Sequence, residues 1–133
     1  MNRSQTREMA FKLLYQIEIQ KEVNKEDINL FFENNQIASK ESQDYIENVV
    51  NGINKEEKEI INIISKNLKE DWEIERISKI NLALLKLGIY EIIYKKLPFK
   101  VVINEVVELA KKYGEETSHL FINGILASVV KEA

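Results

Sequence analysis

The sequence predicts an all-α fold of about seven helices in one domain over residues 1–133, and two observations lead to this prediction. Apolar residues recur at three- and four-residue spacing along most of the chain, as on the buried face of a helix, and strand-like alternation never persists for long. The chain has only four glycines and one proline, too few for the many tight turns of an all-β protein of this size.

The first two helices are predicted from apolar spacing and from a capping residue. The first runs from Ser4 or Thr6 to Gln20. Asn24 has a short polar side chain that can cap the start of a second helix, and the acidic residues that follow favour the positive end of the helix dipole. This second helix is short and ends near residues 34–35.

A third and a fourth helix are expected in the middle of the chain. Ser39 is the predicted N-cap of the third helix. Asn54 and Glu57 have the spacing of a capping box, so we expect the fourth helix to begin there and to run through Leu68. Each helix carries a stripe of isoleucine and valine at helical spacing, which predicts one buried face.

The next helix is expected to be the central one. From Ser78 or Lys79 to about Tyr94 the chain is apolar on almost every side, which is typical of the central helix of a bundle. Pro98 interrupts the pattern, because proline lacks the backbone N–H that a helix interior needs. We expect the earlier helices on one side of this central helix and the later ones on the other.

The last two helices are predicted over residues 101–113, closed by Gly114, and over residues 120–130. The pair Asn123-Gly124 is a typical β-hairpin turn, but the apolar residues around it recur at helical spacing. Glycine costs a helix about 1 kcal/mol relative to alanine. We therefore expect a neighbouring helix to approach Gly124 too closely for a Cβ atom, with Asn123 as a polar group at that crossing.

Composition argues against catalysis, metal binding and membrane insertion. The chain has no cysteine and no Gly-rich phosphate loop. Its one histidine, His119, lacks a partner at metal-ligand spacing, and Glu105 and Glu108 lack the histidines of a di-metal carboxylate site. No signal peptide and no apolar run of about 20 residues is present. We expect a cytoplasmic protein without catalytic residues, cofactor or metal.

Charge is distributed unevenly along the chain, although the formal net charge is only −3. Basic residues exceed acidic ones over residues 1–12, acidic residues dominate residues 41–75, and residues 76–112 hold eight basic against three acidic residues. Such asymmetry favours a polyanion or an acidic partner on one side of the molecule.

Two groups of residues make RNA the preferred polyanion. Arg3 and Arg7 lie four residues apart, so their guanidinium groups could share one helix face and bind phosphate. Phe121 lies close to Thr117 and Ser118 at a predicted helix start, where backbone N–H groups attract phosphate and an aromatic ring can stack on unpaired bases. The alternatives are a solvated N-terminus for the arginines and core packing for the phenylalanine.

Three stretches resemble the NusB transcription antitermination family: TREMAFKLLYQIE (6–18), WEIERISKINLALLKLGIYEI (72–92) and LPFKVVINEVVELAKKYGEETSHLFINGIL (97–126). The third is the most specific, because it follows the family pattern Pro-x-x-Val-x-Ile-Asn-Glu and the later Phe-Val/Ile-Asn-Gly almost without gaps. The likeness covers essentially the whole chain. It implies two three-helix bundles that share a long central helix, and no catalytic activity.

The resemblance also implies a function. Family members bind the boxA sequence of nascent transcripts, chiefly in ribosomal RNA leaders, as a heterodimer with NusE, a small-subunit ribosomal protein. The complex joins RNA polymerase and other Nus factors and keeps elongation going past terminators. The positions that correspond to RNA-binding residues are Arg3, Arg7, Lys12, Thr117, Ser118 and Phe121. The positions that correspond to the NusE-facing surface are Tyr15 and Asn81.

Two departures from the family pattern qualify this implication. Arg3-Ser4-Gln5 stands where other members often carry a run of basic residues, so we expect a shallower dependence of RNA affinity on salt. Asn81 stands where an acidic residue is common.

Two other interpretations remain. The same helical module precedes the catalytic domain of some ribosomal RNA cytosine methyltransferases, although a chain ending at Ala133 leaves no room for a nucleotide-binding domain. A structural homo-oligomer is the other, since some members dimerise.

Overall fold

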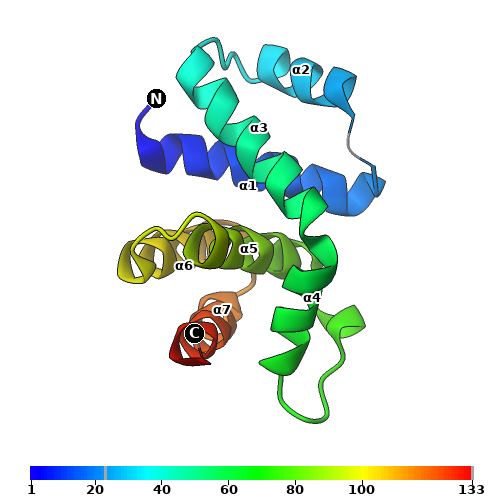
Figure 1. The fold of residues 1–133 in the computed structure, drawn as a ribbon, viewed down its shortest axis with the longest axis vertical. Coiled ribbons are helices and arrows are strands. Elements are labelled where there is room, and N and C mark those ends of the chain that lie inside the picture. The colour runs from blue at the N-terminus through cyan, green and yellow to red at the C-terminus, as the bar shows by residue number, and fades with distance from the viewer. Residues whose placement is uncertain (23, 133) are drawn as a thin grey trace.

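The structure is a computed structural model that describes residues 1–22 and 24–132, and within them every regular element is helical (Figure 1). The α-helices are α1 (Arg3–Gln20), α2 (Lys25–Asn34), α3 (Lys40–Lys55), α4 (Glu57–Lys66), α5 (Lys79–Ile89), α6 (Phe99–Tyr113) and α7 (Ser118–Glu132). A 3₁₀ turn, η1 (Ile74–Arg76), precedes α5, and a π-helical turn, η2 (Tyr90–Tyr94), extends it. The predicted all-α fold is confirmed.

Helix α5 lies between two groups of helices, as predicted, but α4, which was expected on the side of the earlier helices, packs on α7 of the later group (Figure 1). Helix α1 packs on α5 and α3 in one group, while α6 and α7 pack on each other and on α5 in the other. Buried apolar side chains of both groups meet around α5 and form a continuous core. Among the described helices, none combines the length and the apolar character needed to cross a membrane.

Short polar side chains cap most of the helices. Asn24, Ser39 and Ser78 each accept a hydrogen bond from a backbone N–H in the first turn of the helix that follows, as predicted for the first two. Helix α1 begins slightly earlier than expected, because Asn2 and Gln5 form a capping box.

The capping box predicted for Asn54 and Glu57 is wrong. Asn54 lies inside the last turn of α3, and an N-cap residue needs a backbone conformation outside the helix. Glu56 separates α3 from α4 without a side-chain cap, and α4 ends at Lys66 rather than Leu68.

The close approach predicted at Gly124 is also wrong. A Cβ atom there would meet no heavy atom within 4 Å, and both Asn123 and Gly124 are exposed. The buried side of α7 consists of Ile122 and its helical neighbours, so the Asn-Gly pair falls on the opposite side. Where α7 crosses α5, the close approach is at Gly88 instead, where a Cβ atom would lie 2.9 Å from Cδ1 of Leu126 and would clash.

Candidate nucleic-acid interface

The guanidinium group of Arg7 lies beneath the surface, at the junction of α1, η2 and α6. The residue is only 3% exposed. Its Nε lies 2.6 Å from Oε1 of Glu91, and its Nη1 lies 3.0 Å from Oε1 of Glu105. Burial alone would lower the pKa of Arg7, but the hydrogen bond and charge of Glu91 outweigh it and raise that pKa. Glu91 and Glu105 both bind the guanidinium group of Arg7. This group is therefore not exposed to solvent beside Arg3, in contrast to the prediction that the two arginines share an exposed face.

Glu91 organises a second contact at this junction. It is completely buried, and its Oε2 accepts a hydrogen bond of 2.6 Å from the hydroxyl of Tyr45 on α3. Burial and the negative charge of Glu91 raise the pKa of Tyr45. The guanidinium of Arg3 lies over the ring of Tyr45, 4.6 Å from its centroid. Arg3 is exposed, so this cation faces solvent.

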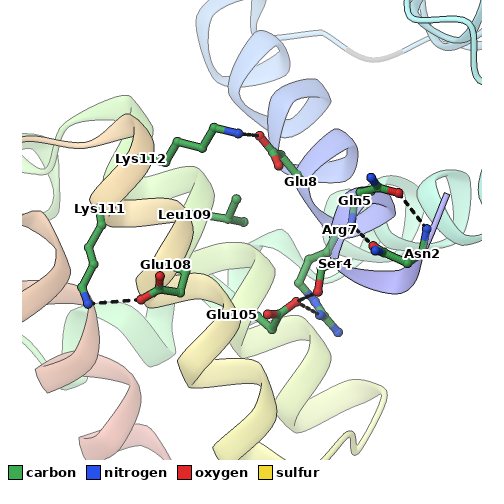
Figure 2. Close-up of a pocket in the computed structure, with 10 residues that line it drawn as sticks. All are labelled: Asn2, Ser4, Gln5, Arg7, Glu8, Glu105, Glu108, Leu109, Lys111 and Lys112. Carbon is green, nitrogen blue, oxygen red and sulfur yellow. Dashed lines mark hydrogen bonds and ion pairs between the residues drawn. The ribbon is translucent and has the colours of Figure 1, made fainter.

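A groove of about 440 Å³ separates the start of α1 from α6 (Figure 2). Its carboxylates are paired with cations. Besides Glu105 with Arg7, Glu108 lies 3.1 Å from Lys111, and Glu8 lies 2.7 Å from Lys112. The lining also includes Ser4, whose hydroxyl donates to Glu105. Because the charges of the groove are compensated internally, it offers little net attraction for an anion.

Lys12 continues the basic side of α1 beyond this groove. It is half-buried, and its Nζ lies 5.8 Å from the ring centroid of Tyr113. The hydroxyl of Tyr113 donates to Glu8, which also binds Lys112. The side chain of Lys12 thus lies against the C-terminal end of α6.

The residues predicted to contact RNA at the start of α7 differ in their exposure to solvent. The helix begins at Ser118 rather than at residue 120. Ser118 is buried, and its hydroxyl accepts a 2.9 Å hydrogen bond from the backbone N–H of Glu115, which closes the turn before the helix. Thr117 is exposed and Phe121 is half-buried. Ser118 therefore shapes this end of α7, while Thr117 and Phe121 reach its surface.

Phe121 has an aromatic neighbour that the sequence did not assign to the site. Trp72 lies before η1, is 43% exposed, and its ring centroid lies 5.7 Å from that of Phe121. The two rings line an apolar groove of about 450 Å³ with Leu120 and Gly124 among its walls. The missing side chain of Gly124 leaves this groove open. The sequence does contain a signal for this residue. Trp72 is the single tryptophan and lies in a charged connector, where a role in the core is not expected.

The two residues predicted to face a protein partner come from α1 and α5. Tyr15 is half-buried, stacks on Phe11, and lines a groove of about 490 Å³ between α1 and α2 with the exposed Ile19 and Leu30. Asn81 lies in the first turn of α5, and its Oδ1 is buried without a hydrogen-bond partner among the described residues. A buried carbonyl oxygen without a donor is costly.

The carboxylates of the described residues near these surfaces are held in ion pairs. Among the described residues, no cluster of three or more histidine, cysteine, aspartate or glutamate side chains is placed to hold a metal ion. The buried carboxylates are paired with Arg7 and Lys86 rather than with a nucleophile. The arrangement suits binding through cations, aromatic rings and unpaired polar groups.

Comparison with known proteins gives matches along the whole chain. The model of the NusB family matches residues 4–131. The transcription antitermination protein NusB of Ruminiclostridium cellulolyticum is 46% identical over 132 residues, which cover 98% of this chain and 90% of that protein. The transcription antitermination protein NusB of Listeria monocytogenes is 41% identical, with 99% and 98% covered.

Solved structures agree with the sequence matches. NusB of T. maritima aligns with a TM-score of 0.87 and 32% identity, covering 99% of this chain and 92% of that one. A chain in the crystal structure of antitermination factors NusB and NusE in complex with dsRNA aligns with a TM-score of 0.89 and 29% identity, covering 100% of both chains.

Proposed function

The chain belongs to the NusB family, and from this premise we propose that it is a transcription antitermination factor. It acts as a single domain over residues 1–133 that binds boxA-type RNA of nascent transcripts together with NusE. It joins the RNA polymerase elongation complex with other Nus factors in the cytoplasm, and its role is binding rather than catalysis.

One observation carries this proposal: the chain matches NusB proteins over almost its full length in both sequence and fold, and its fold also matches a chain in the crystal structure of NusB and NusE in complex with dsRNA. The surface chemistry supports it. Arg3 and Lys12 supply cations for phosphates. Thr117 lies at the start of α7, and Phe121 with Trp72 offers aromatic faces on which unpaired bases can stack.

The NusE-facing surface is proposed around Tyr15 and Asn81. The exposed Ile19 and Leu30 beside Tyr15 give a partner apolar area to cover. Oδ1 of Asn81 is buried without a hydrogen-bond partner among the described residues, so rotation of this side chain toward a donor of the partner would satisfy it. An asparagine can serve such a donor without the desolvation of a charged carboxylate.

The test is a titration of labelled boxA RNA with this protein, with and without its cognate NusE, at two salt concentrations. We expect weak binding by the protein alone and marked tightening when NusE is added. A scrambled RNA of the same length and composition is the control. Equal affinity for boxA and scrambled RNA in the presence of NusE would contradict the specific role.

A homodimer is a second candidate, because Ile19 and Leu30 are more than half exposed on one side of the molecule. Sedimentation equilibrium with the wild type and Leu30→Asp distinguishes the two uses of this surface. A dimer that dissociates in the variant, with unchanged NusE binding, assigns the surface to self-association.

A further inference from the structure

We propose that Arg7, Glu91 and Tyr45 form a buried relay that positions the guanidinium of Arg3 for an RNA phosphate. Arg7 and Tyr45 are then positioning residues, and Arg3 is the residue that touches RNA. This inference rests on the proposed function and assigns a mechanism to one part of its RNA surface.

Glu91 is the central residue of the relay, because both of its carboxylate oxygens have a hydrogen-bond partner. Oε1 of Glu91 lies 2.6 Å from Nε of Arg7, and Oε2 accepts a 2.6 Å hydrogen bond from the hydroxyl of Tyr45. Glu91 is completely buried, so these charge-assisted bonds are screened little by water. The phenol of Tyr45 is therefore anchored at its hydroxyl, and its ring has a fixed position between α3 and the start of α1.

Arg3 uses the outer face of that ring. Its guanidinium lies 4.6 Å from the centroid of Tyr45, within the range of a cation–π contact. The hydroxyl of Tyr45 donates to Glu91, and its raised pKa extends this protonated state to higher pH. A long arginine side chain loses rotamer freedom when it binds phosphate, and the stack restricts that freedom beforehand.

Arg7 also keeps the charge of Arg3 available. The carboxylates at this junction, Glu91 and Glu105, both pair with Arg7, and Ser4 donates a further hydrogen bond to Glu105 (Figure 2). Arg3 forms no ion pair with any described residue. One buried arginine thus pairs with both carboxylates, and the guanidinium of the exposed Arg3 is left without an ion pair among the described residues and can bind a ligand.

A double-mutant cycle tests this relay on full-length protein with NusE and boxA RNA. Tyr45→Leu removes the ring, and Arg3→Ala removes the cation. We expect Tyr45→Leu to weaken RNA binding about two- to five-fold in the wild-type background and to have almost no effect in the Arg3→Ala background. Arg3→Ala should lower the slope of log affinity against log salt by about 0.7, the value for one lost phosphate contact on a single strand.

Two further variants separate positioning from general stability. Tyr45→Phe keeps the ring but removes the hydrogen bond to Glu91, so its loss of affinity should lie between those of the wild type and Tyr45→Leu. Tyr94→Leu is the matched control, because Tyr94 is also half-buried and stacked, on Tyr90, but has no contact with Arg3. It should leave RNA affinity unchanged.

A measurement without RNA gives an independent readout. In the free protein, ring current from Tyr45 should shift the Arg3 side-chain protons upfield in the wild type and in Tyr45→Phe, and the shift should vanish in Tyr45→Leu. Random-coil shifts for Arg3 in the wild type would overturn the inference regardless of RNA binding.

The RNA outcomes are equally decisive. Additive losses for Tyr45→Leu and Arg3→Ala would mean that the two residues act independently, and would overturn positioning while leaving the proposed function intact. If Tyr94→Leu lost as much RNA affinity as Tyr45→Leu, the loss would reflect reduced stability of the fold. That result would also overturn the positioning role of Tyr45. Absence of any boxA binding by the wild type with NusE would overturn the proposed function, and the relay's role in RNA binding with it.

Discussion

Lys86 and Glu18 form an ion pair in the interior between α5 and α1, with side chains only 4% and 11% exposed. Glu57 on α4 approaches the same ammonium group at 2.8 Å. Lys86 therefore links three helices through one charge. Lys86→Met should lower the free energy of unfolding by about 3 kcal/mol, because it leaves Glu18 as an uncompensated, largely buried carboxylate. Urea denaturation followed by circular dichroism measures the change.

The control for this prediction is an exposed pair of the same chemistry. Lys40 and Asp44 lie one turn apart on α3, with side chains 88% and 62% exposed. Lys40→Met should change stability by no more than about 0.5 kcal/mol. Equal effects of the two substitutions would show that burial does not strengthen the role of Lys86.

Glu8 makes the stability of the protein depend on pH in the acid range. Burial would raise the pKa of Glu8, but hydrogen bonds from Lys112 and Tyr113 outweigh it and hold that pKa below its ordinary value of 4.5. The unfolded chain therefore binds a proton at higher pH than the folded one. The contribution of Glu8 is fully present above about pH 4.5 and is lost as pH falls through the lower folded pKa.

Glu8→Gln should accordingly flatten the acid limb of a plot of unfolding free energy against pH. The measurement is a series of urea midpoints from neutral pH into the acid range. Asp44→Asn is the control, because Asp44 lies in an exposed pair. An unchanged acid limb in Glu8→Gln would show that other carboxylates govern it.

Tyr15→Asp should abolish NusE binding and leave the helices intact. Tyr15 is half-buried, so a carboxylate there can reach water, but it would place a charge in the apolar area beside Ile19 and Leu30. Calorimetric titration with NusE measures the loss, and Tyr15→Phe should retain binding. Unfolding of Tyr15→Asp by circular dichroism would instead assign Tyr15 to the core, where it stacks on Phe11.

Much of the helical framework could be predicted from sequence because its signals are local. Caps at Asn24 and Ser39 and the apolar spacing of the central helix depend on residues only a few positions apart. The errors arose where the answer depends on distant residues. Gly88 and Gly124 look equivalent in the sequence, and only the position of Leu126 in space shows which of them is at a helix crossing.

The site residues also divide into those predicted from local signals and those whose position depends on residues far away in the chain. A basic N-terminus and an aromatic near a helix start are local patterns, and Arg3 and Phe121 do reach the surface. The burial of Arg7 depends on Glu91 and Glu105, which lie 84 and 98 residues away in the chain. The periodicity of α1 contains no information about those partners, so Arg3 and Arg7 were both predicted to be exposed.

The aromatic pair at the start of α7 should contribute to RNA affinity by stacking. Phe121→Ala and Trp72→Ala should each weaken boxA binding by about 1–3 kcal/mol if a base lies on the ring that is removed. Leu120→Ala is a matched control, because Leu120 is 65% exposed and lines the same groove but has no aromatic face. Fluorescence anisotropy measures the affinities. An effect of Leu120→Ala as large as that of Phe121→Ala would favour apolar contact over stacking.

Substitution by alanine should change the stability of the protein in opposite directions at Gly124 and Gly88. Gly124 is helical and has open space where a Cβ atom would lie, so Gly124→Ala should stabilise the protein by about 1 kcal/mol through helix propensity. Gly88→Ala would place its Cβ atom 2.9 Å and 3.1 Å from the two methyl groups of Leu126, and should destabilise by about 1–3 kcal/mol through overpacking. Thermal unfolding distinguishes the two signs. Stabilisation by both substitutions would show that Leu126 moves aside at little cost, and that α5 and α7 are less tightly packed at this crossing than the structure indicates.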